Sequence, residues 1–338
     1  MEPITTIGLD LAKNVFQVHC VDGVGNVVIK RQLRRSEVLK FFTKVPACLV
    51  DIEACGTAHY WVRELLKLGH NVKLMPPAYV KPYVKRGKTD ATDAEAIAAA
   101  VTRPTMRFVV VESVEQQAVL MLHKARDLLV RQKTMLINAL RAHLAEFGII
   151  AVRGPAGVNT VLDILHATQG ELPRAAVQAL NGLADQLNTV RIEIDKIETE
   201  IKDWHRANEV SQRLATIPGI GPITASAIVA SVPDATLFKS SRQFAAWLGL
   251  TPKSHSSGGK ERLVGINKQG DGYIRRLLVL GATAVTRFTR QGHGIKIWAS
   301  QLLDRNPTRL VTVALANKLA RIVWALLIRK QSYAATVA

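Results

Sequence analysis

The sequence predicts an α/β domain followed by a mainly helical region. Strand-like and helix-like segments alternate through the first hundred residues. From about residue 112 the apolar residues follow a helical period, which becomes regular between residues 180 and 204. The 338 residues are enough for two or three domains with cores of their own, and the 48% hydrophobic content fits a folded protein.

The first domain is expected over residues 1–108. TTIGLDLA, VFQVHCVD and VVIKRQLR predict three strands separated by short turns such as DGVGN. SEVLKFFTKV predicts a helix with Ser36 as its N-cap. The strand CLVDIEA, a helix from Thr57 to about Leu68, the strand VKLMPP and a helix opened by Asp90 complete the series. Three strands, then helix, strand, helix, strand and helix, is the order of an RNase H-like (RuvC-like) domain, whose ligands bind at the carboxyl ends of the strands.

The second region, residues 109–208, is expected to form long helices. Residues 121–143 contain five Lys or Arg residues and a single acid, Asp127. A seam with alternating spacings of three and four follows, formed by Leu180, Leu183, Leu187, Val190, Ile194, Ile197, Ile201 and Trp204. This period predicts a coiled coil or a long helical hairpin. We favour self-association through the seam over the edge of an intramolecular bundle.

The third region, residues 209–338, combines helices with one polar loop. TIPGIGPITASAIVASV (216–232) is similar to a helix-hairpin-helix element, whose N–H groups at a helix start hold a phosphate, and an ordinary helix-to-helix turn is an equal alternative. The polar loop is KSHSSGGKERL (253–263). The apolar stretch 310–328 carries Asn317, Lys318 and Arg321, so we expect a buried or amphipathic helix rather than a membrane span.

The charge of the chain points to a polyanionic partner. Lys and Arg number 45 against 27 Asp and Glu, a formal net charge of +18, and nucleic acid is the usual partner of such a chain. The three cysteines form no CxxC pair, so neither a zinc site nor a disulfide framework is indicated. MEPITTIGLD does not look like a secretory signal, and a cytoplasmic location is expected.

Acidic residues are the first candidates for chemistry. Asp10 ends the apolar run IGLD and Glu53 ends VDIE, so both are expected at the carboxyl edge of neighbouring strands. Asp90 and Asp93, three apart, share one helix face. If that helix packs beside the strand ends, the four carboxylates repel one another, and one or two Mg²⁺ ions would relieve the repulsion. The alternative is that Asp90 merely caps its helix, and we favour the metal site. Asp51 points to the same face as Glu53 and is interpreted as a bystander.

The polar loop offers a second kind of chemistry. A serine hydroxyl near a metal and a phosphodiester is a nucleophile once its proton is removed and the phosphate charge is neutralised. Ser254, Ser256 and Ser257 lie in this loop, and His255 is more readily interpreted as an exposed histidine than as a base. The cations that could neutralise the phosphate are Lys260, Arg262, Lys268, Arg275 and Arg276. Composition alone favours a linker.

A family resemblance rests on an ordered set of motifs: GLDLAK, DIEACGT, KTDATDAEAIA, IPGIGPITA, FAAWLGLTP, SSGG and INKQGDGYIRRLLV. Together they resemble the insertion-sequence transposases of the IS one-ten family, in its IS eleven-eleven branch, over nearly the whole chain. The resemblance implies a RuvC-like DEDD domain, a coiled-coil segment and a C-terminal transposase domain over 209–338.

The resemblance also implies roles for individual residues. Asp10, Glu53, Asp90 and Asp93 would form the DEDD metal site, and Ser257 would be the nucleophile that forms a phosphoserine link with DNA. Because Ser256 is adjacent, the resemblance does not decide whether Ser257 or Ser256 is the nucleophile. A noncoding bridge RNA would pair with donor and target DNA. The protein would assemble as a dimer to tetramer, in which the acids of one subunit meet the serine of another.

The predicted function is therefore an RNA-guided DNA recombinase, associated with the nucleoid when it acts. One competing hypothesis is a metal-dependent, RuvC-like junction-resolving endonuclease that uses water as its nucleophile. Another is a non-catalytic nucleic-acid-binding assembly protein. The candidate contacts to RNA or DNA backbones are Lys85, Arg86, Lys88, Lys124, Arg131, Lys133, Lys260, Arg262, Lys268, Arg275 and Arg276.

Overall fold

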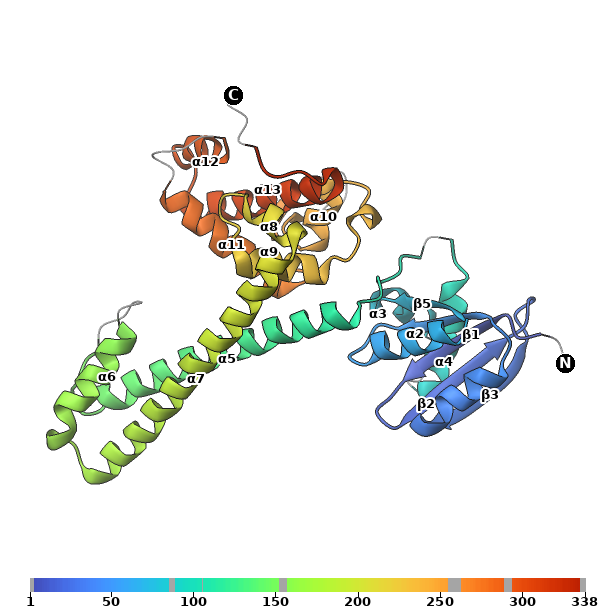
Figure 1. The fold of residues 1–338 in the computed structure, drawn as a ribbon, viewed down its shortest axis with the longest axis horizontal. Coiled ribbons are helices and arrows are strands. Elements are labelled where there is room, and N and C mark those ends of the chain that lie inside the picture. The colour runs from blue at the N-terminus through green and yellow to red at the C-terminus, as the bar shows by residue number, and fades with distance from the viewer. Residues whose placement is uncertain are drawn as a thin grey trace. The chain divides into compact units, whose positions relative to one another are not determined.

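The computed structural model describes residues 3–84, 89–104, 106–151, 157–254, 263–288 and 294–334. The chain divides into two units, residues 1–113 and 114–338. Figure 1 shows a mixed sheet with helices in the first unit and, apart from one short strand pair, helices in the second. The second unit thus contains residues 114–208 of the predicted helical segment and all of the predicted transposase segment.

A five-stranded sheet forms the N-terminal unit, in the order β3-β2-β1-β4-β5. Its strands are β1 (Thr6–Leu11), β2 (Val15–Val21), β3 (Val27–Arg34), β4 (Leu49–Glu53) and β5 (Asn71–Met75). β1, β4 and β5 are parallel, whereas β2 runs antiparallel to both β1 and β3. The three strands predicted at the N-terminus and the two that follow are confirmed.

The helices of this unit are α1 (Val38–Lys44), α2 (Ala58–Lys67), α3 (Pro77–Val80) and α4 (Asp90–Val101), with short 3₁₀ turns at Arg35–Glu37 and Lys81–Tyr83. The prediction that Ser36 caps the first helix is wrong, because Ser36 lies inside the first 3₁₀ turn. The Glu37 carboxylate accepts a hydrogen bond from the Arg34 backbone N–H at 2.7 Å. This contact closes the turn and moves the start of α1 past Ser36.

The sheet has two different faces because side chains alternate along each strand. Ile7, Leu9 and Ile52 are fully buried in a core that also contains residues of α1 and α2. The alternate residues face α4, which packs against β1 and β4. Gly8 allows this close approach, since a Cβ added there would lie 2.1 Å from the backbone oxygen of Ala94. Asp51 pairs with Gly8 in register and therefore lies on the same face.

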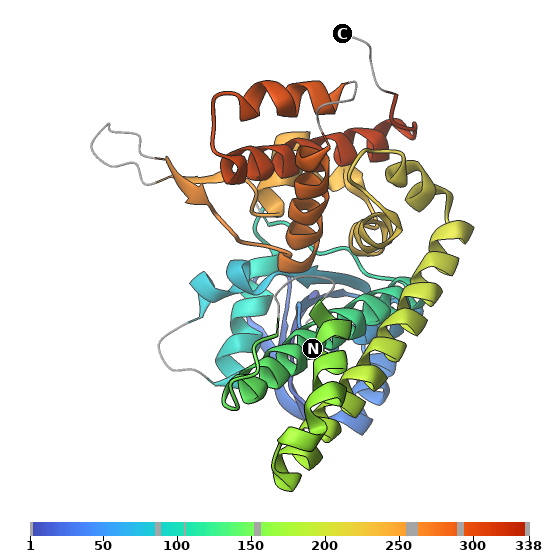
Figure 2. The same cartoon turned by 90° about the vertical axis from the view of Figure 1, so that its left-hand side faces the viewer.

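The helices of the C-terminal unit are α5 (Val114–Ala145), α6 (Gly157–Thr168), α7 (Arg174–Ala207), α8 (Glu209–Ala215), α9 (Pro222–Ser231), α10 (Ser241–Trp247), α11 (Gly272–Arg287), α12 (Ile295–Leu303) and α13 (Thr308–Arg329). An antiparallel strand pair, β6 (Pro252–Ser254) and β7 (Leu263–Ile266), extends from this unit in Figure 2.

The apolar seam of α7 packs against other helices of the same chain. α5 and α7 pack along each other as a long helical hairpin. Leu180, Leu187, Ile194 and Ile201 are at most 5% exposed. The other seam positions remain half-buried, and self-association through them stays a prediction.

The core of the C-terminal unit forms around α13, which packs against α10 and α11. α13 is the one helix in the described residues that is long and apolar enough to span a membrane. Its residues Leu315, Leu319 and Val323 are fully buried in the core of this unit. The apolar character of α13 therefore serves packing, as the sequence analysis predicts.

Helices α8 and α9 pack together and are joined by a tight turn at residues 216–221. Gly219 in this turn has φ +88° and lies against Gly281 of α11. A phosphate-binding role for the turn remains a prediction.

Candidate active site

Two of the predicted acids lie side by side at the carboxyl edge of the sheet. β1 and β4 are paired up to Leu9 and Ile52, and Asp10 and Glu53 are the next residue on each strand. Both are half-buried. Parallel neighbouring strands thus bring two carboxylates to one edge, as the sequence predicts.

The other two acids lie in the first turn of α4, which packs across β1 and β4. The alternative that Asp90 caps this helix is wrong, because Thr89 is the N-cap. The Thr89 hydroxyl accepts a hydrogen bond from the Thr92 backbone N–H, and the Thr92 hydroxyl donates to the Thr89 carbonyl at 2.7 Å. Asp90 is exposed and Asp93 is half-buried.

The charges of the other three acids act on Asp10. The pKa of Asp10 is raised from 3.8 to about 6, first by burial and then by the charges of Asp90, Asp93 and Glu53. A hydrogen bond from the Leu11 backbone N–H opposes this rise. Like charges raise a carboxyl pKa only when they are close, so the sheet edge and the start of α4 form one acidic cluster.

The donor chemistry of this cluster fits a hard divalent cation. All its donors are carboxylate oxygens, which suit Mg²⁺ and do not favour zinc. Within the residues that the structure describes, no three His, Cys, Asp or Glu side chains already stand in the arrangement of a metal site. Carboxylates without a counter-ion repel one another, and a cation is what would draw them together.

A fifth carboxyl, Asp51, lies behind this cluster. Its side chain is fully buried, and neither of its oxygens has a hydrogen-bond partner in the described part of the chain. Burial raises its pKa from 3.8 to about 8. The interpretation as a bystander overlooked this burial, although its position between the apolar residues Val50 and Ile52 is a signal that could have revealed it.

The serine segment connects β6 to β7. The two strands pair up to Ser254 and Leu263, which fixes both ends of the segment 255–262. Ser256, Ser257, Lys260 and Arg262 lie outside the described residues, as do Lys85, Arg86 and Lys88.

Two of the cations predicted to contact nucleic-acid backbones instead interact with groups of the protein itself. The Arg275 guanidinium donates to the carbonyls of Leu248 and Gln269, both at 2.9 Å. Arg276 pairs with Asp127 at 2.5 Å. Arg275 therefore holds the end of α10 against the segment that precedes α11, and the charge of Arg276 is compensated.

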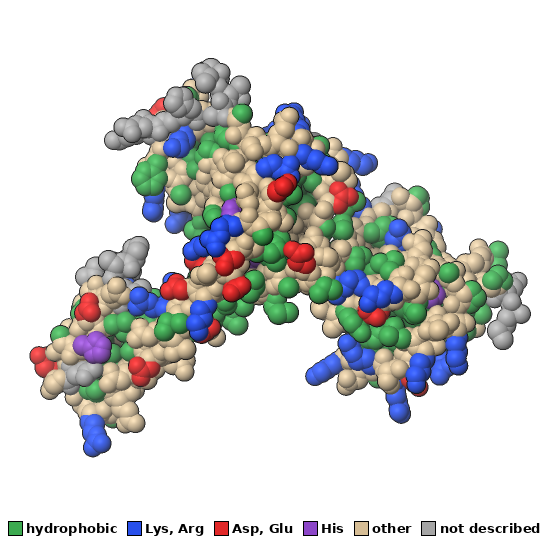
Figure 3. Space-filling model, viewed as in Figure 1, with side chains coloured by type: hydrophobic (Ala, Val, Ile, Leu, Met, Phe, Trp, Pro, Cys, Tyr) green, Lys and Arg blue, Asp and Glu red, His purple; other side chains and the backbone are tan. Residues whose placement is uncertain are grey.

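The other described cations that are predicted to contact nucleic acid have side chains that are exposed or half-buried. Lys124 and Arg131 are exposed on α5 and Lys133 is half-buried there, while Arg131 lies 3.6 Å from Asp127. Lys268 is exposed after β7 with φ +61°. On the face shown in Figure 3, Lys and Arg predominate over the N-terminal unit, whereas the α5–α7 hairpin carries both signs.

A buried polar network joins α5, α9 and α11. The Ser226 hydroxyl donates to the Pro222 carbonyl at 2.7 Å, so its oxygen accepts from His123 Nε2 at 3.1 Å. His123 Nδ1 then accepts from the Tyr273 hydroxyl, also at 3.1 Å. Burial, with a smaller effect of Arg126, lowers the pKa of His123 to about 4. The imidazole is therefore neutral at pH 7 and fixes the register of the three helices.

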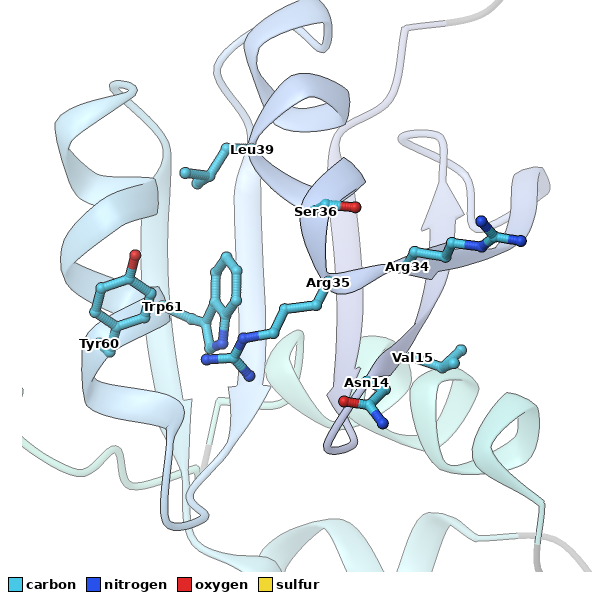
Figure 4. A pocket seen from close by; sticks show the side chains of 8 residues that line it. All are labelled: Asn14, Val15, Arg34, Arg35, Ser36, Leu39, Tyr60 and Trp61. Carbon is cyan, nitrogen blue, oxygen red and sulfur yellow. The ribbon is translucent and has the colours of Figure 1, made fainter.

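The N-terminal unit also has a hollow of about 690 Å³ lined by Arg34, Arg35, Tyr60 and Trp61 among others. In Figure 4 the Arg35 side chain extends beneath the Trp61 indole, whose ring centroid lies 5.1 Å from the guanidinium carbon. Trp61 is only 3% exposed, so Arg35 covers a ring that belongs to the core. This hollow is separate from the acidic cluster.

Comparison with known proteins identifies the family. A model of the DEDD transposase domain of the IS110 type matches residues 7–149, and a model described as the transposase IS116/IS110/IS902 family matches residues 211–295. The first match contains all four acids of the cluster, and the second contains the segment 255–262.

Several relatives match along almost the entire chain. A probable family 20 transposase of Pseudomonas aeruginosa is 51% identical, over 98% of both chains. The transposase for insertion sequence element IS1111A of Coxiella burnetii is 41% identical, over 98% of this chain and 92% of its own. The transposase for insertion sequence element IS1328 of Yersinia enterocolitica is also 41% identical, over 96% of this chain and 97% of its own. The chain therefore belongs to the IS116/IS110/IS902 family of transposases, the IS one-ten family of insertion sequences.

Proposed function

We propose that this transposase is an RNA-guided DNA recombinase, which cleaves and rejoins donor and target DNA through a covalent phosphoserine intermediate. The observation that carries the proposal is the acidic cluster, in which burial and three neighbouring carboxylates raise the pKa of Asp10. A cluster of this kind favours a hard divalent cation, and such cations serve phosphodiester chemistry in many nucleases. The match to a DEDD domain supports the use of a divalent metal.

Asp10, Glu53, Asp90 and Asp93 would hold the metal, with Mg²⁺ as the proposed ion. When bound, Mg²⁺ would stabilise the negative charge that develops on the scissile phosphate. Two strand ends and a helix start provide these four carboxylates, so the packing of α4 on the sheet orients them.

Ser257 would be the nucleophile. Its Oγ would form a bond to phosphorus while the bond from phosphorus to the leaving DNA oxygen breaks, and the hydroxyl proton would pass to a base. The resulting ester keeps the energy of the phosphodiester. A hydroxyl of the exchanged strand would then attack the same phosphorus and release the serine. The pairing of β6 with β7 supports this role, because it anchors both ends of the segment that carries Ser257.

A noncoding bridge RNA and a homo-oligomer complete the proposal. Their support is the family resemblance and the net charge of +18, which suits a chain that holds several nucleic-acid strands. Base pairing would select the sequence, while Lys and Arg side chains would bind the backbones.

The first test is to express the protein with its native flanking noncoding DNA and to sequence the nucleic acid that co-purifies. A discrete RNA from the flank is expected. Heterogeneous cellular RNA that salt removes would refute RNA guidance and leave the transposase activity in place.

The second test asks whether a serine or a water molecule is the nucleophile, with DNA as the substrate. Ser257→Ala is expected to abolish both cleavage and the covalent protein–DNA product, and Ser256→Ala is the matched control that keeps them. Cleavage that persists in folded Ser257→Ala but is lost in Ser256→Ala would make Ser256 the nucleophile, and cleavage that persists in both variants would favour the water-dependent endonuclease.

The third test addresses the metal without relying on activity. Mg²⁺ is expected to raise the melting temperature of the wild type and to raise that of Asp93→Asn by less, because a ligand that binds only the folded state stabilises it. Strand exchange that survives in Asp93→Asn would support a non-catalytic role for the acids.

A further inference from the structure

A groove of about 1020 Å³ runs between the β6–β7 hairpin and α13. Leu250, Pro252, Val264 and Ile266 line it on the hairpin side, and Trp298 of α12 lines it as well. Figure 2 shows the hairpin extending beside α13 in this unit. The groove therefore begins at the strands that anchor the serine segment.

α13 contributes one continuous face to the groove. The lining residues Arg309, Val313, Asn317 and Arg321 recur every four positions and share one side of the helix. The opposite side, with Leu315 and its neighbours, is buried in the core. The groove face is mixed and open: apolar residues such as Leu310 and Val313 lie among the polar ones, and Leu310 is 59% exposed. α13 thus presents an apolar side to the core and a mixed side to the groove.

All the charge in the groove has one sign. Its charged lining residues are Lys268, Arg309, Lys318 and Arg321, and no acid lines it in the described residues. Across the same described part of the chain, none of the four forms an ion pair within 4.0 Å. Burial and the charge of Arg321 lower the pKa of Lys318. Uncompensated cations around a groove attract a polyanion.

An aromatic ring accompanies the cations. The Lys318 ammonium lies 4.2 Å from the centroid of the half-buried Trp298 ring. Cations along a groove together with an aromatic platform are the recurring features of single-strand nucleic-acid sites, where phosphates contact the cations and bases stack on the ring. A duplex keeps its bases inside and gains little from an apolar wall.

We propose that this groove binds the DNA single strand that leads to the bond attacked by the hairpin serine. Lys268, Arg309 and Arg321 contact its phosphates, while Trp298 and the apolar groove residues of α13, such as Leu310 and Val313, contact its unpaired bases. The occupant is DNA, because the β6–β7 hairpin that forms one wall also carries the proposed nucleophile. This inference rests on the proposed function for the identity of the strand, and the binding itself is measurable without any cleavage.

The test uses full-length Ser257→Ala protein, freed of nucleic acid by salt and kept in EDTA, so that no strand is cut. Fluorescence anisotropy measures its affinity for a short labelled DNA strand, for the corresponding duplex and for RNA of the same sequence. The groove variant is Arg309→Gln/Arg321→Gln. Its matched control is Arg174→Gln/Lys202→Gln, which removes two exposed charges of α7 outside the groove.

The groove variant is expected to bind single-stranded DNA at least tenfold more weakly, while the control changes by less than about twofold. The slope of log affinity against log salt should fall by about 1.4 for the two lost phosphate contacts. Trp298→Leu should weaken binding by about tenfold with little change in that slope, because stacking is not a charge interaction.

An unchanged single-strand affinity in the groove variant would overturn the inference. An equal or larger loss for the duplex or the RNA would overturn it as well, by assigning the groove to another strand. Circular dichroism and melting of each variant exclude unfolding, and Lys318→Met provides a second variant that preserves packing. Cleavage that persists with Ser257→Ala in Mg²⁺ would refute the proposed nucleophile without changing the binding result, so the two failures are distinguishable.

Discussion

The packing of α4 on the sheet is open to a direct test at Gly8. In Gly8→Ala the new Cβ would lie 2.1 Å from the backbone oxygen of Ala94 and 2.6 Å from the backbone nitrogen of Ala98. Ordinary contact begins near 3.4 Å, so α4 has to move away by more than 1 Å. A flexible side chain could rotate aside, but the backbone of a helix cannot.

The magnitude follows from overpacking and from the position of the acids. Overpacking of a well-packed site costs about 1–3 kcal/mol, and a clash with helix backbone belongs at the upper end of that range. The shift also carries Asp90 and Asp93 away from Asp10, because both belong to the first turn of α4. We therefore expect a loss of about 3 kcal/mol in the free energy of unfolding of the N-terminal unit, together with weaker Mg²⁺ binding.

Hydrogen exchange of β1 and β4 peptides in increasing urea measures the stability of this unit, and titration calorimetry measures Mg²⁺ binding. Gly56→Ala is the matched control, since a Cβ there would meet nothing within 4 Å. If Gly8→Ala matches Gly56→Ala in both stability and Mg²⁺ affinity, then α4 does not rest on Gly8 and the derived geometry of the site is wrong.

Two further predictions concern buried polar groups. Asp51 has a pKa raised from 3.8 to about 8, so between these values the folded state keeps a proton that the unfolded state has lost, and stability falls as pH rises. From about pH 5.5 to about pH 7.5 the wild type should therefore lose about 3 kcal/mol more than Asp51→Asn, measured by the same exchange experiment in EDTA, and equal pH slopes would contradict the burial. His123→Leu removes both hydrogen bonds of the imidazole and leaves the half-buried Tyr273 hydroxyl without its acceptor, which should cost about 1–3 kcal/mol in thermal unfolding of the C-terminal unit. An unchanged melting temperature would mean that the network contributes nothing.

The sequence alone determined the order of strands and helices in the first unit and the two strand-end acids. Both depend on local rules: side chains alternate along a strand, and parallel neighbours end at the same edge. The sequence therefore places Asp10 and Glu53 beside each other. To bring Asp90 and Asp93 close to Asp10, it needs only the assumption that their helix packs beside the strand ends. The family resemblance, carried by short motifs in fixed order, was equally a property of the sequence, and the comparisons confirm it.

Only the tertiary structure decided how particular polar groups are used. Arg275 donates to two carbonyls that lie close to it only after folding. The groove along α13 likewise depends on which elements flank the helix, since its apolar residues look alike in the sequence whether they face the core or the solvent. Local patterns fix which face of an element is apolar, but the neighbour that covers that face is a long-range contact, and no spacing along one segment specifies it.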